Sequence, residues 1–273
     1  MLRRAKPMLG TLTDIRITAP GHADVKVAMT DAFRLMSEID TSLSFHRPMS
    51  ALSSLNASPM QWTDMGRHGA RILWLAKALG RLSDNRFNVT LGGALVTVGA
   101  LPCHTEADFL PCGSWEDIEI KGTRARLKRP VLVTLDGIAK GYAVDMAVSC
   151  LKRSGVRAGS VNAGGDLKVF GEYGIKVLLR NSQGFTDTLW LKNAALASSR
   201  LGGGPDARFP SLIICQDAPP ENSPQTESLL SVIAPFAWRA DALTKVLASA
   251  TPDMVTRLGG HIPYPASNPE STP

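Results

Sequence analysis

A short segment in the middle of the chain combines two glycines and one lysine at a spacing that suits an anionic ligand. It runs from Val133 to Asp145 and reads V-T-L-D-G-I-A-K-G-Y-A-V-D. Its first part predicts a strand and its last part the start of a helix, with Gly137, Lys140 and Gly141 around the turn. A helix that begins there directs backbone N–H groups and the positive end of its dipole at one point. Glycine lets a ligand approach the backbone, and lysine adds a charge. The segment predicts a phosphate or diphosphate pocket; an ordinary strand–turn–helix with a surface lysine is the alternative.

A second segment further along the chain, Val161 to Leu167, reads V-N-A-G-G-D-L. Together the two segments resemble the signature of the ApbE-like family of FAD:protein FMN transferases, which carries D-L-G-G-I-A-K-G-Y-A-V-D followed by N-A-G-G-D. Further stretches resemble the family in the same order over nearly the whole chain: Met8–Thr11, Leu43–Ser50, Leu55–Asn56, Leu82–Thr90 and Ala240–Leu243.

The resemblance implies an enzyme that splits FAD at its pyrophosphate. FMN passes through a phosphoester to a Thr or Ser hydroxyl of a partner flavoprotein, and AMP leaves. The resemblance also implies FAD as substrate, Mg²⁺ as the metal, and an acceptor flavoprotein subunit of a redox system as partner. Two alternatives stay open. One is an FAD-binding protein without transfer activity, which acts as a flavin carrier or maturation factor. The other is an FAD pyrophosphatase, in which water replaces the protein hydroxyl.

The resemblance also implies which residues of this chain form the site. The contacts to the flavin nucleotide fall on Leu9, His46, Asp136, Lys140 and Tyr142. The metal ligands are the carbonyl oxygen of Ala139 and the side chains of Asp241 and Thr244. Oxygen ligands of this kind are those that a hard cation such as Mg²⁺ prefers.

The chain departs from the family pattern on the helix that carries Asp241. The family reads A-D-A-L-A-T, whereas this chain reads A-D-A-L-T-K from Ala240 to Lys245. Thr244 thus follows the aspartate by three residues, and Lys245 stands at the usual threonine position. Both positions lie near the same helix face as Asp241. Thr244 could therefore still reach a cation, which is the site we expect, or the Lys245 ammonium could take the cation's place and pair with Asp241.

A second departure concerns the catalytic base. The family has an H-I-I-D-P-x-T-G segment, but the corresponding stretch, Pro210–Cys215, contains no histidine and no D-P-x-T-G follows it. A base must lie within hydrogen-bonding distance of the hydroxyl that it deprotonates. The catalytic residue is therefore unknown, with Ser211 and Lys245 as the remaining candidates. Asn162 and Asp166 are expected to fix backbone turns.

Composition limits the function classes. The chain has 273 residues, of which 44% are hydrophobic, and a net charge of +6. This charge suits an anionic ligand. The chain has no basic run with interleaved aromatic residues, the pattern that would predict nucleic-acid binding. No apolar run approaches the roughly 18 residues of a membrane span. The basic N-terminus lacks an apolar stretch typical of a signal peptide. A cytoplasmic protein is expected from the chain as written, or a periplasmic one if a leader was removed.

The expected fold follows from hydrophobic periodicity. Helices and strands come in blocks, which predicts an α+β fold of mostly antiparallel sheets flanked by helices; the resemblance implies an ApbE-like, T-fold-related architecture. We expect one domain of two interlocked α/β subdomains over residues 1–260 and a disordered tail over 261–273. The predicted helices are Val25–Ile39, Ala70–Leu82, Gly141–Arg153 and Trp238–Ala250. The predicted strands include Thr11–Thr18, Val131–Leu135, Ser160–Ala163, Asp166–Phe170, Ile175–Arg180, Thr186–Leu191, Ser211–Cys215 and Leu230–Ala234, with a hairpin over Trp115–Arg129.

Overall fold

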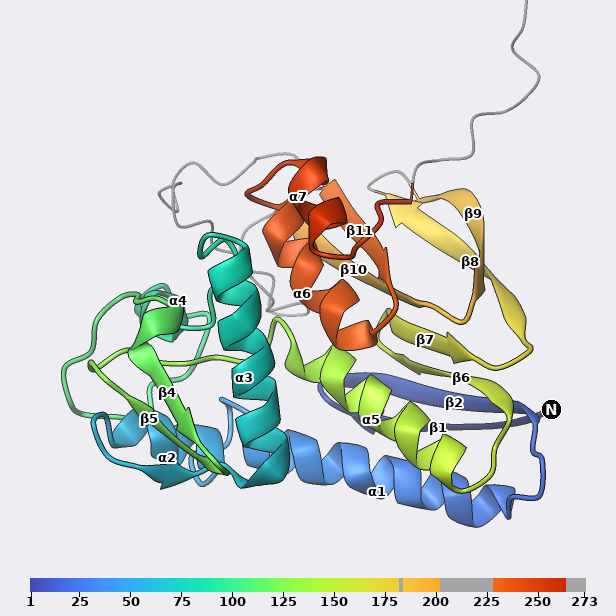
Figure 1. The fold of residues 1–273 in the computed structure, drawn as a ribbon, viewed down its shortest axis with the longest axis horizontal. Helices are drawn as coiled ribbons and strands as arrows, with labels where there is room; N and C mark the ends of the chain where they lie inside the picture. Colours follow the sequence, from blue (N-terminus) through green and yellow to red (C-terminus); the bar gives the residue numbers. More distant parts are fainter. Residues whose placement is uncertain (182–183, 202–227, 264–273) are drawn as a thin grey trace, which may run out of the picture.

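The computed structural model describes residues 1–181, 184–201 and 228–263. Within them the chain forms the expected α+β fold, with antiparallel sheets and flanking helices (Figure 1). The main sheet has six strands in the order β1-β2-β6-β7-β10-β11, and each neighbouring pair is antiparallel. Their bounds are β1 Leu2–Met8, β2 Thr11–Ala19, β6 Ala158–Ala163, β7 Asp166–Phe170, β10 Ala195–Leu201 and β11 Ser228–Ala234.

Three long helices lie against this sheet. Helix α1 (Val25–Leu43) packs along α5 (Ala139–Arg153), and α5 in turn packs on β6 and β7. Helix α6 (Ala237–Leu247) crosses α5 and covers β10 and β11, with α7 (Pro252–Arg257) beside it (Figure 1). Asp24 is the N-cap of α1, and its side chain accepts hydrogen bonds from the backbone N–H groups of Lys26 and Val27. Most apolar residues of α1 recur at helical spacing and are buried, so the predicted helix forms, and it continues past Ile39 to Leu43.

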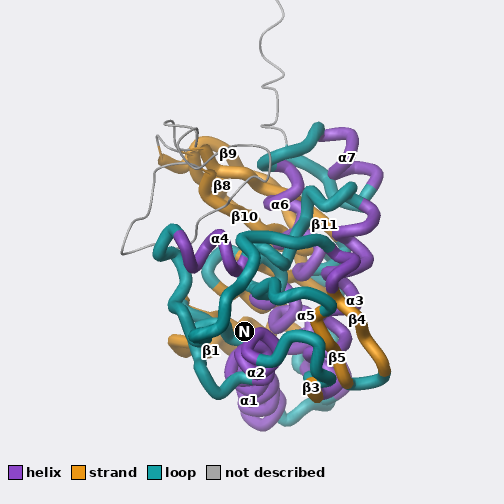
Figure 2. Tube along the Cα trace, turned by 90° about the vertical axis from the view of Figure 1, so that its left-hand side faces the viewer, coloured by secondary structure: helices purple, strands orange, loops and turns teal. Residues whose placement is uncertain are grey.

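A smaller layer stands beside the main sheet. It contains a three-stranded sheet in the order β3-β5-β4, together with α2, α3 and α4 (Figure 1). The bounds are α2 Ala51–Ala57, β3 Thr63–Asp64, α3 Gly66–Leu82, α4 Gly92–Thr97, a 3₁₀ turn η1 over Trp115–Asp117, β4 Ile118–Lys121 and β5 Arg124–Leu127. The β4–β5 hairpin confirms the predicted hairpin. A two-stranded ribbon, β8 (Gly174–Asn181) with β9 (Gly184–Lys192), lies at the end of the molecule opposite α1 (Figures 1 and 2).

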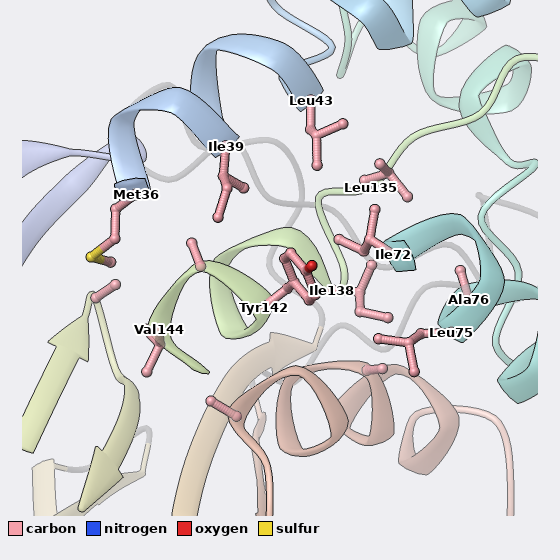
Figure 3. Packing of buried hydrophobic residues seen from close by; sticks show 14 of the residues in the cluster. Met36, Ile39, Leu43, Ile72, Leu75, Ala76, Leu135, Ile138, Tyr142 and Val144 are labelled. Atoms are coloured by element: carbon pink, nitrogen blue, oxygen red, sulfur yellow. The ribbon is translucent and has the colours of Figure 1, made fainter. Parts of the chain in front are cut away.

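One hydrophobic cluster joins the two layers. Figure 3 shows Ile39 and Leu43 of α1, Ile72 and Leu75 of α3, and Tyr142 of α5 meeting in it. This cluster fixes the position of the segment before α5 relative to both layers. The expected single domain over residues 1–260 stays a prediction. Within the described part of the chain, no helix is long and apolar enough to cross a bilayer.

The predicted strand over Val131–Leu135 is wrong. The segment is buried, as expected, but its backbone pairs with side chains and loops instead of a neighbouring strand. The side chain of Asn56 forms both bonds to one residue: its Oδ1 accepts from Val133 N at 2.8 Å, and its Nδ2 donates to Val133 O at 2.9 Å. Thr134 N donates to the carbonyl of Val89. Asn56 thus replaces a strand partner, a role that apolar periodicity cannot reveal.

Other boundaries also differ from the sequence-based expectation. Helix α5 begins two residues earlier than predicted, at Ala139, and α6 ends at Leu247 instead of Ala250. Strands β1 and β10 were not predicted, because neither has a clear apolar alternation. His261, which we assigned to the tail, forms a β-bridge with Ile233. The predicted strand Ser211–Cys215 and residues 264–273 of the tail lie outside the described residues.

Candidate functional site

The N-terminus of α5 forms the centre of the candidate site. Ala139 N donates to the carbonyl of Leu135 at 2.8 Å, which closes the turn that leads into the helix. Gly141 lies where α6 begins, and a Cβ added there would overlap the carbonyl oxygen of Ala237. Glycine is therefore required by the close approach of the two helices. Their joint is strengthened by Asp145, which accepts from Trp238 N at 2.9 Å and so caps α6 from the neighbouring helix.

Asp241, one of the predicted site residues, lies where α5 and α6 meet. It is 1% exposed, and both of its carboxylate oxygens have donors. Oδ2 accepts from the backbone N–H of Gly141 at 3.3 Å, and Oδ1 lies 2.5 Å from Lys245 Nζ. The carboxylate therefore links α6 to the first turn of α5.

Thr244 and Lys245 point toward the same place from α6. The Thr244 hydroxyl donates to the carbonyl of Asp241 at 2.7 Å and lies 2.7 Å from Ser199 Oγ on β10. Lys245 Nζ also donates to Ser199 Oγ at 3.1 Å and to the carbonyl of Asp241 at 3.2 Å. An ammonium whose protons are directed at three acceptors cannot serve as a base, so this geometry argues against Lys245 as the catalytic residue.

Lys140 and Asp166 form a second pair at this end of α5. Lys140 Nζ lies 3.6 Å from Asp166 Oδ2, and that oxygen is buried without a hydrogen-bond partner. Burial, followed by the nearby charge of Asp241, raises the pKa of Asp166 from 3.8 to about 7. The Asp166 carboxylate in turn raises the pKa of Lys140. Asp166 thus pairs with Lys140 at the site, and its predicted role in the turn stays a prediction, whereas Asn162 fixes the turn by accepting from Gly165 N at 3.0 Å.

Asp136 lies at the turn, within the electrostatic influence of His46. Both side chains are exposed. The protein packed around the turn nevertheless raises the pKa of Asp136, and Asp241 adds to the rise, while His46 and Lys140 oppose it. The structure therefore brings Asp136, Lys140 and Asp241 into one electrostatic group with His46 at its edge.

Leu9 lies in the two-residue turn between β1 and β2. Leu9 and Gly10 both have positive φ values, 55° and 69°, as a tight hairpin of the I′ type requires. A positive φ is unfavourable for leucine, and backbone strain of this kind is often kept at functional sites. The turn is next to the β6–β7 turn, because a Cβ added at Gly164 would overlap the side chain of Thr11. Leu9 thus lies at the sheet end where β7 begins with Asp166.

Tyr142 is not presented at an open surface. Its side chain is 3% exposed within the hydrophobic cluster (Figure 3), and its hydroxyl lies 2.9 Å from His68 Nδ1. In this structure Tyr142 therefore packs the core behind the α5 N-terminus. Ser211, the other candidate for the base, lies outside the described residues.

The sequence missed Ser199, which contacts both Thr244 and Lys245. Its strand was not predicted, and serine carries no motif signal of its own. The sequence also could not show that the Lys245 stem passes Gly137: a Cβ added at Gly137 would lie 3.4 Å from Lys245 Cε. Both contacts depend on how distant segments pack together.

The comparisons with known proteins agree with this arrangement. A profile of the ApbE family matches residues 9–259. A curated FAD:protein FMN transferase of Vibrio cholerae serotype O1 is 28% identical over 178 residues, which are 60% of this chain and 53% of that protein. The chain thus spans about half the length of this curated relative.

Solved structures match over almost the whole chain. The ApbE protein of Thermotoga maritima superposes with a TM-score of 0.75 at 21% identity, over 95% of this chain and 92% of its own. The apo flavinyl transferase ApbE of Pseudomonas stutzeri gives 0.74 at 21% identity, with coverages of 94% and 86%. The flavin transferase ApbE of Vibrio cholerae gives 0.74 at 23% identity, with coverages of 94% and 89%. These structures share the fold, and the profile match over residues 9–259 shows that the chain belongs to the ApbE family.

Proposed function

We propose that this chain binds FAD at the α5 N-terminus and transfers FMN to a Ser or Thr hydroxyl of an acceptor flavoprotein. The hydroxyl oxygen attacks the phosphorus of the FMN half, the bond to the AMP phosphate breaks, AMP leaves, and the hydroxyl proton passes to a base. The observation that carries this proposal is the basic group at the first turn of α5, where Lys140 and Lys245 surround the family's signature turn. The curated relative with this activity supports it.

The described side chains have separate parts in this reaction. The positive end of the α5 dipole attracts the diphosphate, and Lys140 adds a charge that Asp166 holds in position. Phosphoryl transfer of this kind depends mainly on such positioning and on neutralising the phosphate charges. Leu9, at its strained turn, and His46, beside Asp136, are the residues that we propose for the flavin and ribityl side of the site.

Magnesium is implied by the resemblance, and its expected ligands are Ala139, Asp241 and Thr244. The side chains as they lie do not offer a free set of oxygens. Lys245 and Gly141 occupy the two carboxylate oxygens of Asp241, and the Thr244 hydroxyl is bonded to Ser199 and to the Asp241 carbonyl. Among the residues that the structure describes, no three His, Cys, Asp or Glu side chains are grouped to hold a metal ion. Magnesium dependence stays a prediction, and no step of the proposed reaction uses it.

An assay with FAD and a co-expressed acceptor subunit tests the proposal. We expect AMP in solution, by chromatography, and a protein-bound flavin on the acceptor, by in-gel fluorescence and mass spectrometry. Release of FMN and AMP without labelling would instead identify a pyrophosphatase. Intact bound FAD after prolonged incubation would identify a flavin carrier, which the absence of a histidine in Pro210–Cys215 favours as the second candidate.

A pair of lysine variants on one helix tests the site itself. Lys140→Met should weaken FAD binding by at least about tenfold, since a hydrogen bond to a charged group is lost. Lys152→Met is the matched control, because Lys152 lies in the last turn of α5, away from the turn that precedes the helix. Equal affinities of the two variants would show that the diphosphate does not bind at the first turn.

A further inference from the structure

The ammonium of Lys245 is held at a fixed place beside Asp241. It contacts three acceptors: Asp241 Oδ1 at 2.5 Å, Ser199 Oγ at 3.1 Å and the Asp241 carbonyl at 3.2 Å. These three contacts use the whole donor capacity of a lysine. They come from two elements, α6 and β10, so the charge is positioned by the fold as well as by its own helix.

The stem of the lysine is also packed. The side chain is 22% exposed, and a Cβ added at Gly137 would lie 3.4 Å from its Cε and 3.6 Å from its Cγ. The stem therefore lies along the turn that precedes α5. This places the ammonium between α6 and the signature turn, where its charge and that of Lys140 oppose the rise in the pKa of Asp166.

A divalent cation bound beside Asp241, at the corner where α6 meets the signature turn, would meet two obstacles. It would need an oxygen of Asp241, and each of the two already accepts a hydrogen bond, so the cation would have to share its ligand with the Gly141 N–H or with the ammonium. It would also lie close to the positive charge of Lys245, and like charges repel strongly where protein excludes water. The corner thus already contains its counter-charge to the carboxylate.

We propose that Lys245 is a built-in cation that replaces the divalent metal, so that this chain binds the FAD diphosphate without Mg²⁺. The inference rests on the proposed FAD binding. A phosphate oxygen can take over one of the two longer contacts of the ammonium, to Ser199 or to the Asp241 carbonyl, without breaking the ion pair. Lys245 and Lys140 then approach the diphosphate from α6 and α5.

Titration of FAD into the unmodified protein is the first test. Flavin fluorescence should give dissociation constants that agree within about twofold in excess EDTA and in millimolar Mg²⁺. An affinity at least about tenfold weaker in EDTA would overturn the inference and leave the proposed function intact. If FAD fails to bind in either buffer, the proposed function falls and the inference falls with it.

A lysine variant gives a second test that does not require FAD. Lys245→Thr removes the ammonium and puts a hydroxyl near Asp241, so Mg²⁺ should now raise the melting temperature, as it should not in the unmodified protein. The control is Lys192→Thr, which breaks an exposed ion pair between the end of β9 and Glu172, 2.6 Å apart, and should show no response to Mg²⁺.

The Lys245→Thr variant also allows an outcome that would contradict the inference directly. If Lys245→Thr binds FAD with unchanged affinity in EDTA, Lys245 does not act as the cation. If Lys245→Thr does not fold, calorimetric titration of Mg²⁺ into the unmodified protein decides, because one bound ion per chain would overturn the inference and the absence of heat would support it.

Discussion

Two aspartate–lysine pairs meet at the N-terminus of α5, and they are built differently. In the Asp241–Lys245 pair both carboxylate oxygens have donors, one from the lysine and one from the backbone of Gly141. In the Asp166–Lys140 pair the charges are 3.6 Å apart, and the facing oxygen of Asp166 has no hydrogen bond. We call the first pair closed, because both carboxylate oxygens have donors, and the second pair open, because one carboxylate oxygen has none.

This difference indicates a division of roles. A closed pair satisfies its buried charges and holds α5 against α6 before any ligand arrives. A buried acceptor without a donor is unfavourable until a proton or a ligand group supplies one. The open pair therefore has a lysine that can turn to a diphosphate and a carboxyl that can take up a proton. Rigid and adjustable charges are thus combined at one helix end.

Removing Asp241 should have the largest effect. Asp241→Ala leaves the Gly141 N–H and the Lys245 ammonium without their acceptor. Breaking a buried ion pair from one side costs about 3 kcal/mol or more of unfolding free energy, and we expect the lower end because Lys245 can partly reach solvent. Urea denaturation measures the loss.

The matched control for this variant is an exposed pair on another helix. Asp31 lies 3.2 Å from Arg34 on α1, and both side chains are exposed. Asp31→Ala should change the unfolding free energy by about 0.5 kcal/mol or less. If the two variants lose similar amounts of unfolding free energy, the Asp241–Lys245 pair contributes no more than a surface pair. The contrast between the closed and the open pair then fails.

The contact between α5 and α6 gives a smaller effect. Gly141→Ala places a methyl group against the carbonyl of Ala237, which is backbone and cannot turn away. Such overpacking should cost about 1–3 kcal/mol. Gly137→Ala is the control from the same turn, since its Cβ would make only ordinary contacts of 3.4 to 3.6 Å. Urea denaturation of both variants should separate them; an equal loss would mean that the helices can move apart freely.

The sequence predicted the architecture and the motif positions better than the contacts within the site. The family segments located Lys140, Asp166 and Asp241, and the spacing of Thr244 and Lys245 correctly raised the alternative of an ammonium beside Asp241. The sequence could not predict Ser199, because its position follows from the register of β10 against β7 and β11. Asn56 was missed as a partner of Val133 for a similar reason, since the two are far apart in the chain.

The open pair predicts an unusual dependence of stability on pH. The pKa of an aspartate is ordinarily 3.8, as in the unfolded chain, and that of Asp166 is about 7 in the folded protein. Between these values the folded chain keeps a proton that the unfolded chain releases, so the contribution of Asp166 to stability is greatest at low pH and falls as pH rises. For a single proton, the fall in unfolding free energy is at most about 1.4 kcal/mol per pH unit. Asp166→Asn cannot titrate and should lack this component.

Comparing the unmodified protein with Asp166→Asn between pH 6 and 7.5 isolates the effect. Asp145, whose pKa burial raises to about 6, contributes a slope of the same sign, but that slope is present in both proteins and ends near pH 6. Urea denaturation should show the stability difference shifting in favour of the asparagine variant as pH rises. Parallel stability curves would mean that Asp166 ionises as easily as in the unfolded chain. Its pairing with Lys140 would then be as complete as that of Asp241 with Lys245, and the two corners would not differ.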